Sequence, residues 1–200
     1  MLDRTIPYYN IIMKCTDPKV IPLTLPEGYS VSSYQDGFGN DWAEWEYAVG
    51  DFPSFADAKA YFDKELLPSL EEDPDRGVFV LNEAGKPVGS CLTWYHPKGD
   101  QTVASLHWAI VSPFEQGKGV GRVACTEALN RHAVKGNSPV YLHTQPWSWR
   151  GMRLYISMGF KLEKTDTFSK HINQYSQAME ALKNAVSPEV YSMFEENSED

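Results

Sequence analysis

Cysteine is scarce in the 200-residue chain, and its arrangement excludes the sites that cysteines usually build. There are three, Cys15, Cys91 and Cys125, and no Cys-x-x-Cys pair is present. A disulfide framework needs an even number of cysteines, and structural zinc sites need closely spaced ones. The sequence therefore predicts reduced thiols and no metal site.

Long apolar runs are also absent. The longest near the N-terminus is Ile11–Met13, far below the ~20 apolar residues that a membrane-spanning helix needs. The N-terminal segment also lacks the apolar core of a secretory signal. These absences predict a cytoplasmic protein that does not bind a membrane.

Basic residues are in the minority, with 18 Lys and Arg against 27 Asp and Glu and a net charge of −9. Such a field repels the phosphates of nucleic acids and is neutral to favourable for a cationic amine. The chain shows no internal repeat and no low-complexity linker. Its length fits one domain over residues 1–200.

The hydrophobic periodicity alternates between that of strands and that of helices. Strands are expected at 8–14, 29–34, 78–81, 88–95, 103–111, 140–144 and 161–163. Helices are expected from about 41, 54, 119, 148 and 172, with Pro68 ending the second and residues 195–200 frayed. This order predicts an α+β or α/β fold with a mixed central sheet of about six to seven strands and helices on both faces.

The most informative segment is Val111–Arg122, between an expected strand and an expected helix. It carries three glycines, Gly117, Gly119 and Gly121. Glycines let the backbone approach a ligand closely, and the N–H groups at a helix start form an anion site. Lys118 and Arg122 add positive charge. The segment is therefore expected to bind a pyrophosphate.

Two other phosphate-binding loops do not fit this segment. A Walker A loop needs Gly-Lys followed by Ser or Thr, which is absent from the chain. The dinucleotide fingerprint G-x-G-x-x-G needs a third glycine where Arg122 stands, and it follows a first strand rather than several.

Three motifs resemble the GNAT superfamily of acetyltransferases. Gln116–Gly121 resembles its pattern Q/R-x-x-G-x-G/A, and Val111–Pro113 resembles the V-x-P end of the preceding strand. Leu154–Phe160 resembles the second signature, L-Y-x-x-x-G-F. The resemblance covers a cofactor core of about residues 77–164.

The rest of the chain matches the family only in part. Residues 29–70 correspond by layout to its variable substrate region, and residues 168–194 form a C-terminal helical extension. Ser148 stands where the family often has Asn, and Gly151 where it often has Ala. The family's final strand, after Glu163, is not evident.

The resemblance implies an acetyl-CoA-dependent N-acetyltransferase, without metal, in which splayed strands form the cofactor slot. The acceptor would be a primary amine of a small molecule or peptide, and the protein a monomer or homodimer. A non-catalytic acyl-CoA-binding module is the alternative, and Tyr155 favours the enzyme because a binder does not need it. The implied cofactor-binding residues are Ile110, Val111, Gln116, Gly117, Lys118, Gly119, Val120, Gly121, Arg122, Ser148 and Tyr155.

Two catalytic residues are expected. Tyr155 would be the general acid, because a phenol stays protonated at neutral pH and can reprotonate a thiolate; a core tyrosine is the alternative. His107 would be the general base, on the strand that leads to the cofactor and on the face opposite Trp108. A structural role for His107 is the alternative, and Glu115 and His143 are further candidates for the base.

Two other groups of residues remain open. The frequent aromatic residues could line an acceptor pocket or fill the core: Trp42, Trp45, Trp94, Tyr95, Trp108, Trp147 and Trp149. A seam of apolar residues in the C-terminal extension is expected to dock on the domain or on a partner chain: Ile172, Tyr175, Met179, Leu182 and Val186.

Overall fold

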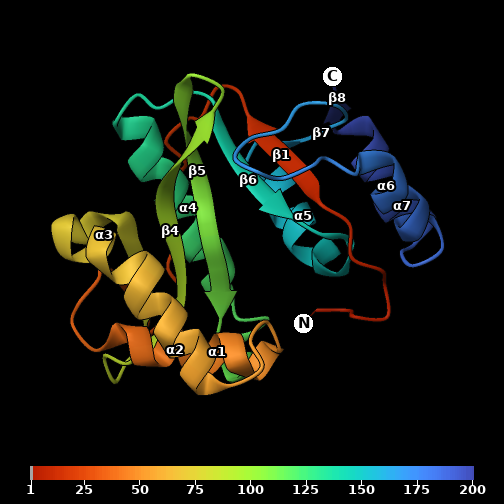
Figure 1. Ribbon diagram of the computed structural model, residues 1–200. Coiled ribbons are helices and arrows are strands. Elements are labelled where there is room, and N and C mark those ends of the chain that lie inside the picture. The colour runs from red at the N-terminus through yellow and green to blue at the C-terminus, as the bar shows by residue number, and fades with distance from the viewer. Residues whose placement is uncertain (1) are drawn as a thin grey trace. The chain divides into compact units, whose positions relative to one another are not determined.

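The computed structural model describes residues 2–200, which form one mixed sheet of eight strands (Figure 1). The strand order is β2-β3-β4-β5-β6-β1-β7-β8. The strands are β1 (Ile11–Cys15), β2 (Ser30–Ser32), β3 (Gly77–Leu81), β4 (Pro87–Lys98), β5 (Gln101–Val111), β6 (Val140–Thr144), β7 (Lys161–Glu163) and β8 (Ser198–Glu199). The predicted mixed sheet is confirmed, with one strand more than the upper expectation.

Helices lie between several of the strands and at the C-terminal end. They are α1 (Phe38–Val49), α2 (Phe55–Tyr61), α3 (Leu67–Glu72), α4 (Val120–Val134), α5 (Trp149–Ile156), α6 (Tyr175–Lys183) and α7 (Pro188–Glu196). Short 3₁₀ turns lie at Pro113–Glu115 and Pro146–Ser148. Within residues 2–200, no helix is long and apolar enough to cross a membrane.

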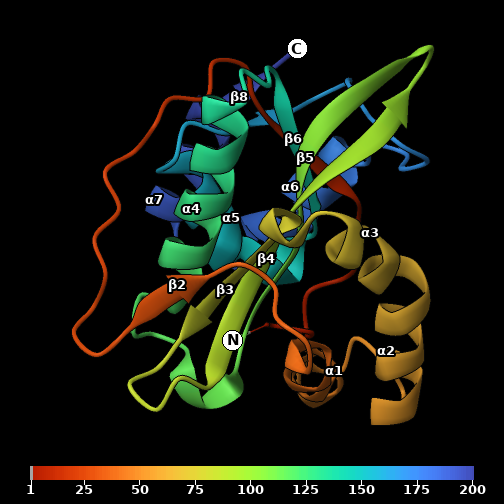
Figure 2. The ribbon, with the colours of Figure 1, turned by 90° about the vertical axis from the view of Figure 1, so that its left-hand side faces the viewer.

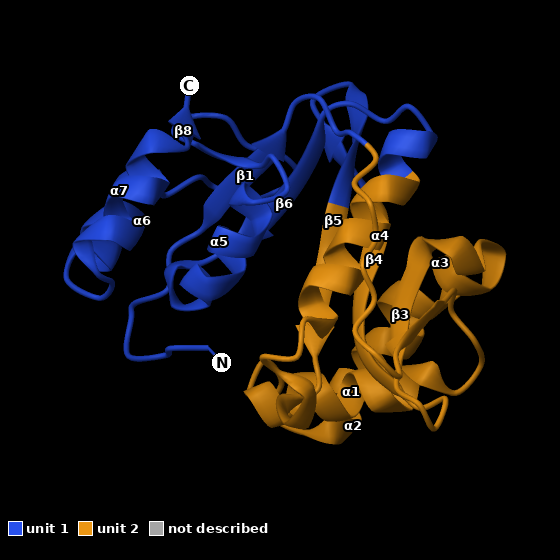
Figure 3. Ribbon diagram, turned by 180° about the vertical axis from the view of Figure 1, so that it is seen from behind, with its two compact units in different colours: residues 1–19, 95–105, 132–200 blue, residues 20–94, 106–131 orange. Residues whose placement is uncertain are grey.

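The chain divides into two compact units (Figure 3). The first unit consists of residues 1–19, 95–105 and 132–200, and the second of residues 20–94 and 106–131. Strands β4 and β5 each contribute residues to both units. The phosphate-loop segment Val111–Arg122 lies in the second unit, whereas Ser148 and Tyr155 lie in the first.

In the second unit, helices cover both faces of the strands, with α4 on one face and α1 to α3 on the other (Figure 2). Leu92 packs with the aromatic residues of the α1 to α3 side. Gly89 faces α4, where a Cβ atom would lie 2.6 Å from Cγ1 of Val120. Glycine is therefore required at position 89, because any side chain would push α4 away from β4.

The prediction that Pro68 ends the second helix is wrong. Ser54 caps α2 as expected, accepting a hydrogen bond from the Asp57 N–H at 3.1 Å. The helix then widens into a π-helical turn at Phe62–Leu66, and α3 continues to Glu72 with Pro68 in its first turn. A wide turn before the proline accommodates the missing N–H, so the ring does not break the helix.

In the first unit, the C-terminal segment is ordered, and the prediction of a frayed acidic end is wrong. Residues 188–196 form α7, and β8 pairs in parallel with β7 through Leu162–Ser198 and Glu163–Glu199. A strand of only two residues, Ser198 and Glu199, leaves no pattern in the sequence that could predict it. The strand forms because the edge of β7 offers backbone partners.

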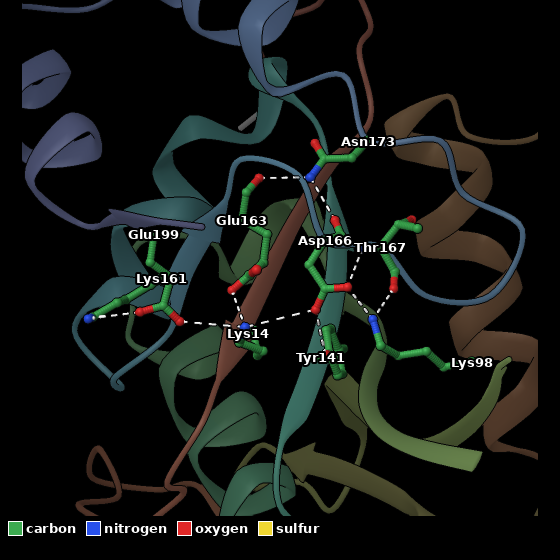
Figure 4. A network of polar contacts seen from close by, with 9 residues as sticks. All are labelled: Lys14, Lys98, Tyr141, Lys161, Glu163, Asp166, Thr167, Asn173 and Glu199. Carbon is green, nitrogen blue, oxygen red and sulfur yellow. Dashed lines mark hydrogen bonds and ion pairs between the residues drawn. The ribbon is translucent and has the colours of Figure 1, made fainter. Parts of the chain in front are cut away.

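A network of ion pairs holds this edge together (Figure 4). The Lys14 ammonium lies 2.8 Å from the fully buried Glu163 carboxylate and 3.7 Å from Glu199. Lys161 binds Glu199 at 2.9 Å. Burial raises the pKa of Glu163, and the nearby Lys14 opposes that rise. The C-terminal residues are therefore tied to β1 and β7 by charge as well as by backbone pairing.

Candidate functional site

The loop before α4 has the backbone shape of an anion-binding site. Gly117 and Gly119 have φ angles of 83° and 87°, which side chains rarely adopt. No atom lies within 4 Å of the place where a Cβ atom on Gly117 would stand. The first helical hydrogen bond runs from the Val123 N–H to the Gly119 carbonyl at 3.1 Å, so the preceding N–H groups of the helix start point out of the helix. The predicted strand–loop–helix context is confirmed.

The strand that leads into the loop is held close to β4. The Ser112 N–H donates to the Val88 carbonyl at 2.9 Å, and the Ile110 carbonyl lies 3.2 Å from the Cβ position of Gly89. Gly121 packs against Val111, with 3.3 Å between its Cβ position and the Val111 Cγ2 atom. Ile110, Val111 and Gly121 therefore pack closely where β5 leads into the loop.

The side chains of the loop are also connected. The Lys118 ammonium lies 3.0 Å from Oε2 of Glu115, and the Tyr29 hydroxyl donates to the same oxygen at 2.5 Å. The Tyr29 hydrogen bond and then Lys118 lower the pKa of Glu115. Glu115 is thus an ionised carboxylate at neutral pH with two donors, which makes it a poor general base. The Arg122 side chain is exposed on the first turn of α4.

His107 lies on β5 in the second unit, but its side chain does not point opposite to Trp108. Trp108 has a φ of 47°, which breaks the alternation of the strand. The rings of His107 and Trp108 lie 5.8 Å apart, and His107 stacks on Trp94 at 5.6 Å. The expected alternation fails at Trp108, because its positive φ departs from the extended geometry of a strand.

Two of the aromatic residues considered for an acceptor pocket, Trp42 and Trp108, pack together in the second unit. Trp42 is fully buried and Trp45 is 3% exposed. Trp108 contacts Trp42, Phe52 and Tyr61, with ring centroids 5.3 to 5.8 Å apart. Trp108 itself is only partly buried, so this cluster joins the core of the second unit to its surface.

Ser148 and Tyr155 lie in the first unit. Ser148 precedes α5 without capping it, and its hydroxyl accepts from the Gln145 amide at 2.9 Å. The Tyr155 ring lies against Gly151 one turn earlier, with the hydroxyl 3.9 Å from the Cβ position of Gly151. Ser148 stands at the N-cap position of α5, but its side chain makes no capping hydrogen bond there.

His143 is placed in a cluster of its own in the first unit. Its ring stacks on His171 with centroids 3.9 Å apart, and its Nε2 atom lies 2.8 Å from the Asn10 side-chain oxygen. Burial and then His171 lower the pKa of His143 to about 3. An imidazole this weakly basic stays neutral, which does not suit a general base.

Tyr29 is a neighbour of the loop that the sequence did not predict. The residue was expected to begin a strand over 29–34, and no motif marks its partner. The contact arises because β2 is preceded by a turn in which the Tyr29 N–H bonds to the Pro26 carbonyl at 3.2 Å. Over residues 2–200, no three His, Cys, Asp or Glu side chains are arranged to hold a metal ion.

The chain is similar to curated proteins and to solved structures. The chain is 26% identical over 149 residues to a mycothiol acetyltransferase of Thermomonospora curvata, a match that covers 72% of this chain and 48% of the relative. It is 28% identical over 160 residues to a mycothiol acetyltransferase of Kocuria rhizophila, covering 70% and 49% of the two chains. The chain thus spans about half the length of these curated relatives.

The fold is similar to solved structures of acetyltransferases. A GNAT-family acetyltransferase of Colwellia psychrerythraea aligns with a TM-score of 0.58 at 15% identity, over 78% of this chain and 54% of that one. A GCN5-related N-acetyltransferase of Sphaerobacter thermophilus aligns with a TM-score of 0.55 at 20% identity, over 80% and 51%. The family model for the acetyltransferase (GNAT) family matches residues 38–160, more than half of the chain. The chain therefore belongs to the GNAT family of acetyltransferases.

Proposed function

We propose that the chain transfers the acetyl group of acetyl-CoA to a primary amine. The observation that carries the proposal is the loop before α4, in which Gly117 and Gly119 adopt positive φ at a helix start. The space beside Gly117, into which no atom intrudes within 4 Å of its Cβ position, fits the close approach of a phosphate. This geometry and the family membership both support binding of the pyrophosphate of CoA at Gln116–Arg122.

The reaction needs an amine without its proton, because only the lone pair can attack the thioester carbon. A new N–C bond forms, the C–S bond breaks, and its electron pair leaves with the sulfur. A backbone N–H near Ile110 and Val111 would stabilise the negative oxygen in the transition state. Tyr155 would protonate the leaving thiolate, and His107 would take the proton of the amine.

The acceptor is proposed to be a small molecule or a peptide that carries a primary amine. The curated relatives are described as mycothiol acetyltransferases, which supports a small molecule. The net charge of −9 favours a cationic amine over an anionic one.

The proposal is tested by incubating the protein with acetyl-CoA and a panel of primary amines while free thiol is measured. We expect thiol release that depends on one class of amine and an acetylated product in equal amount. CoA binding without acetyl transfer to any amine would support the alternative, a non-catalytic acyl-CoA-binding module. Absence of CoA binding would contradict both.

A further inference from the structure

A turn from a distant part of the sequence lies on the phosphate loop in the second unit. The segment before it is fixed to α4, because the Asn130 side chain both accepts from the Ile21 N–H and donates to the Ile21 carbonyl at 2.8 Å. The chain then follows α4 toward its N-terminus (Figure 2). There Pro26 lies 3.5 Å from the Cβ position of Gly119. The segment that Asn130 binds at Ile21 therefore leads to the loop and places Tyr29 beside it.

One oxygen atom accepts from two groups at this point. Oε2 of Glu115 is 2.5 Å from the Tyr29 hydroxyl and 3.0 Å from the Lys118 ammonium. The Glu115 side chain is 18% exposed and that of Lys118 is 52% exposed. The Lys118 ammonium is therefore accessible to another anion, whereas the Glu115 carboxylate is largely covered and is also held by Tyr29.

The carboxylate and a bound phosphate would compete for the same ammonium group. We propose that Glu115 is an internal competitor that Lys118 must leave before it can bind the phosphate of the cofactor, and that Tyr29 is a positioning residue that keeps Glu115 hydrogen-bonded after Lys118 has left. This inference rests on the proposed function, because it assigns the phosphate to CoA. It makes Glu115 and Tyr29 determinants of affinity that act in opposite directions.

The two residues have different expected effects on binding. Glu115→Gln removes the competing charge but keeps the size of the side chain, so CoA should bind about two- to fivefold more tightly, the range that a partly exposed ion pair provides. Tyr29→Phe leaves the Glu115 carboxylate with one partner fewer when Lys118 moves, so CoA should bind about threefold more weakly. In the Glu115→Gln background, Tyr29→Phe should have little effect, because there is no charge left to stabilise.

The experiment is isothermal titration of the full chain with CoA at low ionic strength, on the wild type, both single variants and the double variant. Glu127→Gln is the matched control. Like Glu115, Glu127 is a partly exposed carboxylate, but it lies on α4 and pairs with Arg131 at 3.0 Å. The Glu127→Gln variant removes the same charge without removing the partner of Lys118, so its CoA affinity should stay within twofold of the wild type.

Opposite signs for Glu115→Gln and Tyr29→Phe support the inference, because a merely structural network would weaken binding in both variants. Unchanged or weaker CoA binding by a folded Glu115→Gln variant overturns it. An equal gain in Glu127→Gln also overturns it, because the gain would then come from net charge. Absence of CoA binding by the wild type contradicts the proposed function itself and is distinct from these results.

Discussion

At Tyr155 a phenol lies on α5 with its ring against Gly151. The unperturbed pKa of a phenol is ~10, which suits a group that must donate a proton to a thiolate at neutral pH. We predict that Tyr155→Phe lowers kcat by about 10²- to 10⁴-fold, the usual contribution of general acid catalysis. The affinity for acetyl-CoA should change little, because the hydroxyl acts in the transition state.

The measurement is steady-state kinetics with the acceptor found in the amine panel, together with titration of acetyl-CoA. Tyr191→Phe is the control, since Tyr191 lies on α7 in the C-terminal extension and has no proposed role in the reaction. A Tyr155→Phe variant with wild-type kcat, under conditions in which single-turnover rates match kcat, would return Tyr155 to the role of a core residue.

The sequence predicted the conformation of some individual residues of the site but not of others. The glycines of the loop were predictable, because few other residues tolerate positive φ next to a helix start. The backbone conformation of Trp108 was not predictable, because bulky residues rarely adopt a φ of 47°. The surrounding aromatic cluster, which a local sequence pattern does not reveal, holds it there. The hydrogen bond from Tyr29 to Glu115 was not predictable either, because it joins residues 86 positions apart and no local sequence pattern indicates it.

The stacked pair of His143 and His171 joins β6 to the segment after β7, and it should make stability depend on pH. Burial and then His171 lower the pKa of His143 to about 3, from an ordinary value of 6.5. As the pH falls from 6.5 toward 3, His143 binds a proton in the unfolded chain but not in the folded chain. The free energy of unfolding should therefore fall by up to ~1.4 kcal/mol per pH unit for this histidine.

We predict that His143→Gln reduces this loss between pH 6.5 and pH 4, as measured by urea denaturation at each pH. The other groups near the ring are His171, Tyr8 and Asn10, of which His171 also titrates with a lowered pKa. Lys183→Gln is the control, because Lys183 is an exposed residue of α6 outside the His143 cluster. A variant whose stability falls as steeply as that of the wild type would contradict the assignment.

Elements with strong local patterns were predicted well. The hairpin between β3 and β4 closes through Asn82 and Gly85, and α4 ends at Val134, two residues before Gly136, which has a φ of 71°. The C-terminal extension was predicted less well, because a single helix was expected and Ile172 was placed on its seam. Ile172 is instead 74% exposed and lies before α6. Strand β8 exists through pairing and charge, neither of which a sequence pattern encodes.

For the whole molecule, the C-terminal extension is predicted to stabilise the domain without joining two copies of it. Met179 and Leu182 of α6 and Phe194 of α7 are buried within the first unit. Removing residues 187–200 should therefore lower the melting temperature and leave the number of chains per particle in solution unchanged. Light scattering and thermal denaturation of the two chains measure this. A halved mass would show that the segment holds a dimer together.

The central claim is that the loop before α4 binds CoA, and two glycines of the same α4 region test it most directly. Gly117 and Gly136 have φ angles of 83° and 71°, and neither has an atom within 4 Å of its Cβ position. Replacing either with alanine should cost a similar ~1–2 kcal/mol of stability, because both force a side chain into the left-handed region.

Only Gly117 lies on the proposed phosphate site, whereas Gly136 lies beyond the other end of α4. Titration of CoA into the two folded variants should therefore show affinity lowered tenfold or more, on the order of 1.4 kcal/mol, in Gly117→Ala. Wild-type affinity is expected in Gly136→Ala. Equal affinity in both variants would contradict the account, because the backbone of the loop would then not bind the cofactor.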